Sequence, residues 1–417
     1  VIDNNEGRPE KNLWTEQEDG VKIKHFTAQS EREEAAFISE TMYKQHELNN
    51  VPYGDMAILY RTNAQSRVLE EGLIKRAIPY TMVGGTKFYD RKEIKDVLAY
   101  LKVLFNPFDD LSLLRIINVP KRSIGATTVS KLQSYAQDTG SSLFMTLTQL
   151  HNIPTIKGKT KERLEEFGVL IFGLVASMNE MNVLELLEAI LDQTGYMKEL
   201  EDSTDPQDEA RIENIGELLS VAKEFMDANP TGTVQDFLEQ VALVNDVDSF
   251  EQVDSKVTLM TLHSAKGLEF PVVFLAGLEE GLFPHSRTLM NPEEIEEERR
   301  LCYVGITRAE RELYVSNATT RTVFGKTAGY LPSRFLKEIP QELIEELRAK
   351  AKRPEMTERR IPPHMSVMSR PVTKPIVRNP QVENWQVGDV AMHTKWGKGK
   401  VLALQGEGAG LKLKIEF

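Results

Sequence analysis

One arginine, Arg308, stands where the chain could present it to a phosphate. It follows an acidic, helix-forming segment, residues 293–301, and precedes the strand-like residues 312–315. A guanidinium is planar and permanently charged, so it suits a phosphate group that gains negative charge during transfer. The alternative is a surface arginine that caps the C-terminus of the preceding helix. The position therefore predicts either a phosphate contact or a helix cap.

A second group of chemically capable residues lies on the polar loop between two apolar segments, residues 257–262 and 270–275. Its hydroxyl, imidazole and ammonium groups suit a phosphodiester backbone, and they belong to Thr261, His263, Ser264 and Lys266. Glu269, two residues after Gly267, is a carboxylate that could accept hydrogen bonds from a ribose. The alternatives are a satisfied polar histidine and a solvated loop acid.

Arg61, Thr62 and Asn63 follow a buried strand predicted at residues 55–60. In open parallel sheets, ligands bind outside the carboxyl ends of the strands. These three residues are therefore candidate ligand contacts. The alternative is an ordinary helix N-cap by Thr62 or Asn63. The two roles are compatible, because a cap at this position faces the ligand edge of the sheet.

Two more segments have chemistry that suits nucleic acids. Between two predicted helices lie the cations and the glycine turn of residues 118–128, namely Lys121, Arg122, Gly125 and Thr127. A glycine turn that opens a helix offers free backbone N–H groups to phosphate, although a plain turn between helices is the alternative. Phe324 precedes a glycine in a polar stretch. Its ring could stack on a base for about 1–3 kcal/mol, or it could pack in the core.

The elements that must position these residues alternate at first between strands and helices. Strands are predicted at residues 21–26, 55–60 and 78–83, with helices at residues 31–43 and 64–76. Ser30 and Glu33 form a capping box before the first helix. Such alternation predicts an α/β fold with a parallel sheet and helices on both of its faces.

Helical periodicity dominates from about residue 87 to residue 250. Helices are predicted at residues 92–105, 111–117, 126–138, 161–178, 183–191, 212–226 and 234–244. Strands resume at Val257, so we expect an all-helical insert within the α/β domain. Gly158-Lys159-Thr160 lacks the earlier glycine and the buried strand of a phosphate-binding loop. Asp208-Glu209-Ala210-Arg211 is interpreted as the solvated start of a helix rather than a magnesium site.

The C-terminal region differs again in composition. Residues 349–379 are rich in proline and carry more Lys and Arg than Asp and Glu, so we expect an extended or disordered linker. Short strands and glycine turns then predict a small β domain that includes Trp396 and Lys398 and stops before its last strand or strands. The predicted divisions of the chain are residues 1–86, 87–250, 251–340, 341–383 and 384–417.

Length and composition limit the protein classes that fit. A chain of 417 residues is expected to hold two to four domains. Its net charge of -12 argues against a general nucleic-acid coat, although a narrow basic track on an acidic body is compatible with it. The single cysteine, Cys302, excludes an internal disulfide and fits a reducing cytosol. No apolar run approaches the ~20 residues that span a bilayer. Because the chain lacks an initiator methionine, we interpret it as part of a longer protein.

Three of these segments together resemble a known family. Residues 257–275 and 299–311 are similar to motifs V and VI of superfamily 1A DNA helicases of the PcrA/UvrD/Rep group, and residues 60–67 resemble motif IVa. The resemblance covers essentially the whole chain. It implies a RecA-like domain, 2A, interrupted by the all-helical domain 2B and followed by an SH3/Tudor-like domain. It also implies that domains 1A and 1B, with the phosphate-binding loop and the Mg²⁺ ligands, lie upstream.

The resemblance also implies a role for each candidate residue. Arg308 would reach the γ-phosphate of ATP, and Glu269 with Gly267 would bind the nucleotide. Single-stranded DNA would be contacted by Arg61, Thr62, Asn63, Thr261, His263, Ser264, Lys266 and the base-stacking Phe324. Duplex DNA would be held by Lys121, Arg122, Gly125 and Thr127. Trp396 and Lys398 would bind a protein partner.

The activity that the resemblance implies is that of an ATP-dependent 3′–5′ DNA helicase or translocase of DNA repair and replication. We expect its DNA partners to be single strands and junctions of single and double strands, and its protein partners to be RNA polymerase and mismatch or excision repair proteins. The implied location is the bacterial cytoplasm at the nucleoid, with no membrane association. ATP and Mg²⁺ are the expected cofactors, and we expect this chain by itself to be inactive.

Two other functions fit parts of the sequence. Helicase–nuclease subunits of the AddA or RecB type share these motifs, but they carry a nuclease domain after the motor. Here a proline-rich linker and a small β domain follow instead. The chain could also be a non-catalytic binding module whose tail recruits RNA polymerase and whose helical insert holds duplex DNA.

Overall fold

The computed structural model describes residues 1–6, 20–246, 255–347, 387, 390–393, 397–405 and 412–416. The chain divides into two compact units, Val1–Ala351 and Lys352–Phe417. The first unit contains the sheet and the helical insert, and the second contains the small β domain. Within the described ranges, no helix is both long enough and apolar enough to cross a membrane.

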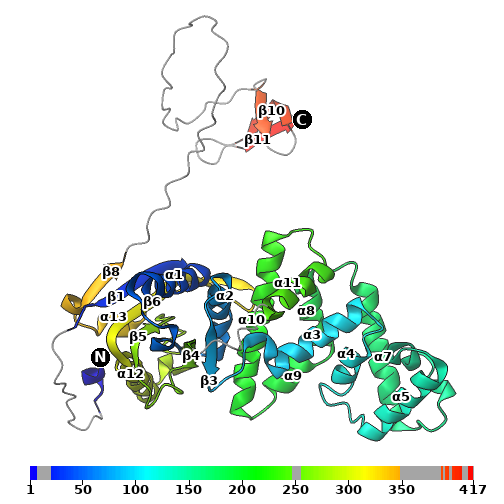
Figure 1. Cartoon of the computed structure of the whole chain (residues 1–417). Coiled ribbons are helices and arrows are strands. Elements are labelled where there is room, and N and C mark those ends of the chain that lie inside the picture. The colour runs from blue at the N-terminus through cyan, green and yellow to red at the C-terminus, as the bar shows by residue number, and fades with distance from the viewer. Residues whose placement is uncertain are drawn as a thin grey trace, which may run out of the picture. The chain divides into compact units, whose positions relative to one another are not determined.

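Alternating strands and helices build the first part of the large sheet (Figure 1). These elements are β1 (Ile23–Ser30), α1 (Glu31–Asn49), β2 (Met56–Tyr60), α2 (Ser66–Lys75) and β3 (Tyr80–Val83). Ser30 caps α1 because its hydroxyl accepts the Glu33 N–H at 3.3 Å, which confirms the predicted helix start. α1 continues past its predicted end at residue 43 and stops before Asn50, which takes a left-handed conformation.

The remaining strands of this sheet come from the second half of the chain. They are β4 (Val257–Thr261), β5 (Phe270–Leu275), β6 (Ala309–Val323), β7 (Lys326–Gly329) and β8 (Ile344–Leu347). Helices α12 (Pro292–Ile306) and α13 (Arg334–Lys337) connect them. The strand order is β3-β4-β2-β5-β6-β1-β8, and all pairs on this path are parallel, whereas β7 pairs antiparallel with β6. The predicted α/β fold is therefore confirmed.

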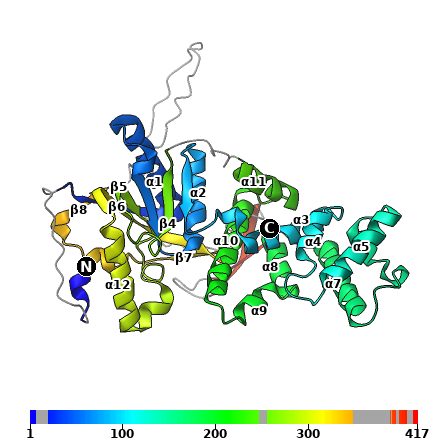
Figure 2. The ribbon, with the colours of Figure 1, turned by 60° about the horizontal axis from the view of Figure 1, so that its bottom comes forward.

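Alternate side chains of β2 point to two different cores, one on each face of the sheet. Ile58 and Tyr60 are buried with residues of α1 and α2. Ala57 and Leu59 are buried with Cys302 of α12 and with residues of α13. Figures 1 and 2 show α1 and α12 on opposite faces of the sheet. This two-sided burial explains why the strand is continuously apolar, and it fixes α12 beneath the strands that end at the candidate site.

The helical insert connects β3 to β4. Its helices are α3 (Lys92–Phe105), α4 (Asp110–Ile116), α5 (Ala126–Thr139), α6 (Leu143–Leu147), α7 (Lys159–Ser177), α8 (Val183–Gln193), α9 (Tyr196–Glu201), α10 (Pro206–Ala228) and α11 (Val234–Asp246). They share one apolar core that is separate from the cores of the sheet. The sequence did not predict α6 and α9, because helices this short show no clear periodicity. The five-part division of the chain stays a prediction.

Helix α10 begins earlier than its predicted start at residue 212. The Asp205 side chain accepts the Gln207 N–H at 2.9 Å, and Pro206 occupies the first turn. An acidic cap followed by proline is a strong start signal, which the periodicity analysis did not use. The segment Asp208–Arg211 therefore lies in the first turns of a helix, as interpreted from the sequence.

Helix α10 also connects the insert to the sheet domain. Arg67 of α2 is almost fully buried, and its Nε donates to Glu217 of α10 at 2.5 Å. Ser220 of the same helix donates its hydroxyl to the Thr322 carbonyl at the end of β6 at 3.1 Å. Figure 2 shows this end of the sheet approaching α10. The insert helix α10 consequently forms one wall of the region next to the strand ends.

The second unit contains a three-stranded antiparallel sheet. Its strands are β9 (Val390–His393), β10 (Gly397–Gln405) and β11 (Lys412–Glu416), in the order β11-β10-β9. This arrangement agrees with the predicted small β domain. Trp396, the side chain of Lys398 and the predicted linker at residues 349–379 lie outside the described residues, so their predicted roles have no structural counterpart here.

Candidate nucleotide and DNA sites at the sheet edge

Two loops that carry candidate residues leave the carboxyl ends of neighbouring strands. β2, β4 and β5 are parallel neighbours, and Tyr60 at the end of β2 lies opposite Thr261 at the end of β4. The Leu262 N–H donates to the Tyr60 carbonyl at 2.8 Å. Two loops that are about 200 residues apart in sequence, starting at Arg61 and at Leu262, therefore leave the sheet side by side. The register of the sheet, and not the sequence spacing, brings their candidate residues together.

Arg308 follows α12, and its guanidinium lies against the loop between β4 and β5. Nε donates to the Val304 carbonyl and Nη1 donates to the Leu268 carbonyl, both at 3.0 Å. Nη2 donates to the Thr307 hydroxyl at 3.0 Å. The bond to Val304 is the helix cap that the sequence allowed as the alternative role. Since the bond to Leu268 reaches across to the loop, Arg308 also connects α12 with the second group of candidates.

Glu269 lies beside Arg308, as a shared nucleotide site would require. Its carboxylate is 3.8 Å from Arg308 Nη1, and its side chain is 58% exposed. Gly267 adopts φ +85°, a conformation that side chains with a Cβ rarely take, although an added Cβ would meet no neighbour. The glycine is thus needed for the turn of the backbone rather than for space. Together these residues form an open, polar corner that ATP could reach.

Helix α12 packs tightly on the start of the same loop. An added Cβ at Gly305 would lie 2.5 Å from Leu262 Cδ2, so a larger residue there would require the Leu262 side chain to shift. Cys302, one turn earlier, is fully buried, and burial raises the pKa of its thiol well above the ordinary value. A neutral, enclosed thiol of this kind acts in packing rather than in chemistry. α12 and the loop at residues 262–269 are therefore in contact at both ends of the loop.

A polar cavity of about 430 Å³ opens beside these loops. It collects five of the predicted DNA contacts, namely Arg61, Thr62, Asn63, Thr261 and His263. The rest of its wall comes from α10, from the loop after β5 and from the first turn of α12, and consists of Pro206, Glu209, Ala210, Glu213, His285, Arg287, Thr288 and Glu294. Glu209 was predicted to lie in the solvated start of a helix, and no functional residue was predicted in the loop after β5.

Arg61 is held by an acid that the sequence analysis missed. Its Nε lies 3.0 Å from both carboxylate oxygens of Glu298, and its Nη2 donates to Glu298 at 2.7 Å. Glu298 also accepts the His285 N–H at 3.0 Å. A carboxylate on the apolar face of α12, beside Ile295 and Cys302, is the sequence feature that could have identified it.

His263 is exposed at the cavity, and its environment favours the neutral ring. Partial burial lowers its pKa, and the nearby charge of Arg61 lowers it further, whereas Glu298 opposes the change. Thr261 and Ser264 share a hydrogen bond of 3.2 Å between their hydroxyls. Lys266 lies exposed on the same loop. These groups give the cavity side of the loop hydroxyl donors and a titratable ring.

Phe324 lies where β6 turns into β7 and is not part of the lining of the polar cavity. It takes φ +50°, and its ring packs so closely on α10 that an added Cβ at Gly216 would lie 2.7 Å from it. Phe324 also lines a second, more apolar cavity of about 370 Å³, together with Thr62, His285 and Tyr330. Its ring is 37% exposed, so one face packs against the insert while part of the side chain remains accessible.

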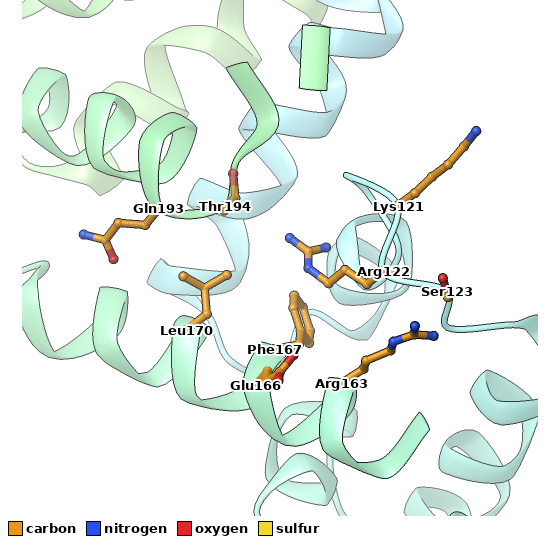
Figure 3. Close-up of a pocket in the computed structure, with 9 residues that line it drawn as sticks. All are labelled: Lys121, Arg122, Ser123, Arg163, Glu166, Phe167, Leu170, Gln193 and Thr194. Carbon is orange, nitrogen blue, oxygen red and sulfur yellow. The ribbon is translucent and has the colours of Figure 1, made fainter. Parts of the chain in front are cut away.

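In the hairpin between α4 and α5, the predicted DNA contacts Lys121 and Arg122 point in different directions, as Figure 3 shows. Lys121 points away from the other labelled side chains, toward solvent, whereas Arg122 points inward over the Phe167 ring. Arg122 donates to the Ile116 carbonyl at 3.0 Å and to the Tyr100 hydroxyl at 2.7 Å. The Arg122 guanidinium thus stabilises the hairpin from inside.

The glycine turn in this hairpin differs from the sequence-based description. Gly125 has an ordinary extended conformation as the N-cap of α5, and the left-handed residue of the turn is Ser123. Thr127 is exposed in the first turn of α5. The hairpin also borders a pocket of about 440 Å³ (Figure 3). Its lining residues are Lys121, Arg122, Ser123, Arg163, Glu166, Phe167, Leu170, Gln193 and Thr194.

The structure thus separates the candidates into three places. Arg308, Glu269 and Gly267 lie at the amino ends of β5 and β6, and Arg61, Thr62, Asn63, Thr261 and His263 line the cavity at the carboxyl ends of β2 and β4. Lys121, Arg122, Gly125 and Thr127 belong to the hairpin of the insert. Among the described residues there is no group of three or more His, Cys, Asp and Glu side chains arranged to hold a metal ion. The functional roles of these residues stay predictions.

Two protein families match this chain, one in each compact unit. The family described as UvrD-like helicase C-terminal domain matches residues 1–320, and the family described as PcrA/UvrD tudor domain matches residues 387–417. The second match covers the three-stranded sheet of the tail. Together the two families account for both compact units.

Individual relatives are proteins named ATP-dependent DNA helicase PcrA. The relative from Bacillus subtilis (strain 168) is 47% identical over 423 residues, which cover 100% of this chain and 57% of the relative. The relative from Leuconostoc citreum is 42% identical, over 100% of this chain and 58% of its own length. The relative from Staphylococcus aureus (strain Mu50 / ATCC 700699) is 44% identical, over 100% and 57%. The chain thus spans somewhat more than half the length of these relatives.

Proposed function

Because the chain belongs to the family of UvrD-like helicases, we propose that it forms the part of an ATP-dependent DNA helicase that brings an arginine to the γ-phosphate and contacts single-stranded DNA. One observation supports this proposal most strongly. The single loop of residues 262–269 has Glu269 and Arg308 at one end and the polar cavity with His263 at the other.

Arg308 would act on the phosphate through its charge and its planar geometry. In the structure its guanidinium donates to two backbone carbonyls and lies near Glu269. A phosphate oxygen could replace the exposed acceptor at Leu268, while the bond to Val304 continues to orient the side chain. An arginine that stabilises transferring phosphate in this way contributes a factor of ~10³–10⁵ in turnover.

The rest of the ATP site would come from residues outside this chain. The sequence contains no phosphate-binding loop. We therefore propose that the phosphate-binding loop and the Mg²⁺ ligands lie in the part of the relatives that this chain does not match. Closure of the two halves around ATP and their reopening after hydrolysis would alternate the grip on DNA. The chain without that other half is proposed to be inactive.

The finer features of the proposed helicase rest on the family resemblance. These are translocation in the 3′ to 5′ direction, action in DNA repair and replication at the bacterial nucleoid, and binding of mismatch or excision repair proteins. Recruitment of RNA polymerase through Trp396 and Lys398 is proposed on the same ground. The duplex contact of the insert would rest on the exposed Lys121 and Thr127, because Arg122 is bonded within the hairpin.

A binding module remains a second candidate function. The match of residues 387–417 to the PcrA/UvrD tudor domain favours it, because this unit is compact by itself. The same match argues against a helicase–nuclease subunit, which would carry a nuclease domain there. A pull-down with the region after residue 380 tests the module directly. Capture of purified RNA polymerase would support it, and no capture at micromolar concentration would reject it.

The decisive test of the helicase proposal is ATP hydrolysis by the complete gene product with and without single-stranded DNA. We expect DNA to stimulate turnover, and we expect unwinding of duplexes with a 3′ single-stranded tail but not of those with a 5′ tail. The 417-residue chain, tested in parallel, should show no turnover above background. Turnover by that chain, or hydrolysis by the complete protein that ignores DNA, would contradict the proposal.

A further inference from the structure

Glu298 is a buried acid on α12, a helix on which three other acids face solvent and Glu296 is half-buried. Only 4% of it is exposed, whereas Glu293, Glu294 and Glu297 on the same helix lie at the surface. A buried carboxylate is unfavourable unless it is paired and its oxygens accept hydrogen bonds. Glu298 meets both conditions through Arg61 and the His285 N–H. Its position is therefore built by three segments that meet at the strand ends.

This pairing occupies most of a predicted DNA contact. Nε and Nη2 of Arg61 both face Glu298, and only 19% of the Arg61 side chain is exposed. Within the described residues, the remaining nitrogen, Nη1, makes no hydrogen bond. A DNA phosphate that approached Arg61 through the cavity would thus compete with a bidentate carboxylate, which is one of the strongest partners a guanidinium can have.

The helix that carries Glu298 also contacts the nucleotide corner. Arg308, which is bonded to the Val304 carbonyl of α12, donates to the Leu268 carbonyl beside Glu269, and Gly305 packs on Leu262 at the cavity end of the same loop. Glu298 and Gly305 lie seven residues apart on α12, which is about 10 Å at the rise of an α-helix. A helix of this length moves as a rigid body, so a displacement at the Arg308 end also displaces the carboxylate of Glu298.

We propose that Glu298 is a positioning residue that controls when Arg61 can contact the DNA backbone. In the structure Glu298 withholds the Arg61 guanidinium from the cavity. Movement of α12, when Arg308 engages a nucleotide, shifts Glu298 and releases Arg61 to a phosphate. The inference rests on the proposed helicase function, because it assumes that Arg308 responds to ATP and that the cavity receives single-stranded DNA. It adds a residue through which the two sites communicate.

The salt dependence of DNA binding reports this release. Each cation that neutralises a phosphate of single-stranded DNA adds about 0.7 to the slope of log K against log salt concentration. The probe is a fluorescein-labelled oligothymidylate bound to the complete gene product, titrated at several KCl concentrations with and without a non-hydrolysable ATP analogue. Without the analogue, Glu298→Gln should steepen the slope by about 0.7 relative to the wild type. The glutamine keeps the shape of the side chain but removes the charge that holds Arg61.

A matched control and a double variant identify the cation that is responsible. Glu297→Gln removes the same charge from an exposed position where the side chain pairs with Arg300, and it should leave the slope at the wild-type value. The double variant Glu298→Gln with Arg61→Gln should lose the steepening. An unchanged slope in Glu298→Gln would overturn the inference, as would steepening that survives the loss of Arg61.

Arg61→Gln alone keeps the inference testable if Glu298→Gln does not fold. The slope of Arg61→Gln should equal that of the wild type without the analogue and should be lower by about 0.7 with it. If the slopes of Arg61→Gln and of the wild type differed by the same amount with and without the analogue, the inference would be overturned. Failure of the proposed function looks different, because the wild-type protein would then not bind the oligothymidylate at all or would not respond to the analogue.

Discussion

Arg308 at the sheet edge and Arg122 in the helical insert occupy similar positions in the sequence but different positions in the fold. Each lies near a helix end and donates to backbone carbonyls. The acceptors of Arg308 lie at an open corner beside the exposed Glu269. The acceptors of Arg122 lie inside a hairpin, where its guanidinium covers the buried Phe167 ring at 4.9 Å.

This difference shows what decides whether an arginine is free to act on a ligand. If Arg308 turns toward a phosphate, water can reach the Leu268 carbonyl that it leaves. If Arg122 turned outward, the Ile116 carbonyl and the Tyr100 hydroxyl would each lose a hydrogen bond from a charged donor in a largely enclosed space, and each would keep one bond to the backbone of Val119. Each hydrogen bond lost from a charged donor is unfavourable by about 1.5–3 kcal/mol. The sequence shows only that both residues are arginines. Whether their hydrogen-bond partners are exposed or enclosed decides which arginine can turn toward a ligand.

The largest effect should come from Arg308→Ala in the complete gene product. We expect ATP turnover to fall by ~10³-fold or more, with single-stranded DNA affinity retained, because the transition-state charge loses its partner. Steady-state hydrolysis at saturating DNA measures the loss. Arg300→Ala is the matched control, since Arg300 lies on the surface of α12 and, among the residues that the structure describes, pairs with Glu296 and Glu297 alone. Turnover within threefold of the wild type in Arg308→Ala would make this arginine a structural cap.

Arg122→Ala should instead act on stability. We expect the unfolding free energy of the insert to drop by about 2–4 kcal/mol, because several enclosed acceptors lose their donor. Hydrogen exchange of the amides in α4 and α5 measures this locally. Arg163→Ala is the control, because Arg163 forms no hydrogen bond or ion pair among the described residues although it lines the same pocket. Equal hydrogen-exchange protection in Arg122→Ala and Arg163→Ala would contradict a stabilising role for Arg122.

A smaller effect concerns pH at the cavity. Burial and Arg61 lower the pKa of His263 below 6.5, so the ring is neutral at pH 7 and gains charge only as the pH falls through the lowered value. A proton taken up there attracts phosphate, so affinity for single-stranded DNA should rise on acidification, by about fivefold if the new ion pair contributes roughly 1 kcal/mol. His263→Gln should abolish that increment between pH 7 and pH 5. The sign is opposite for folding, because the unfolded chain binds this proton more readily, so the free energy of unfolding falls as the pH is lowered.

Most of the sheet could be predicted from the sequence, because its strands are apolar runs bounded by turns and its first helix has a capping box. The start of α10 at Pro206 was missed because the expected helix was defined by its apolar period, whereas Asp205 and Pro206 determine where it begins. The short α6 and α9 could not be predicted, since they depend on the packing of the insert for their stability.

The candidate site was predictable only in part, and for a physical reason. Single segments identify His263, Glu269, Arg61 and Arg308, but the pairing of β2 with β4 brings Arg61 to His263, the pairing of β5 with β6 brings Glu269 to Arg308, and register is a property of the whole sheet. Glu298 and His285 were missed because their partners lie more than 10 residues away, on other elements. Arg122 was predicted as a DNA contact because its carbonyl partners cannot be seen from residue types.

The loop of residues 262–269 is proposed to bind nucleotide at Glu269 and DNA at His263, at opposite ends of the loop. The direct measurement is a pair of titrations on Glu269→Gln in the complete gene product, with ATP in the absence of DNA and with oligothymidylate in the absence of ATP. We predict that ATP binds about tenfold more weakly, since one charge-assisted hydrogen bond is lost, and that DNA affinity is unchanged. Unchanged ATP affinity, or a parallel loss of DNA affinity, would contradict this separation of binding sites.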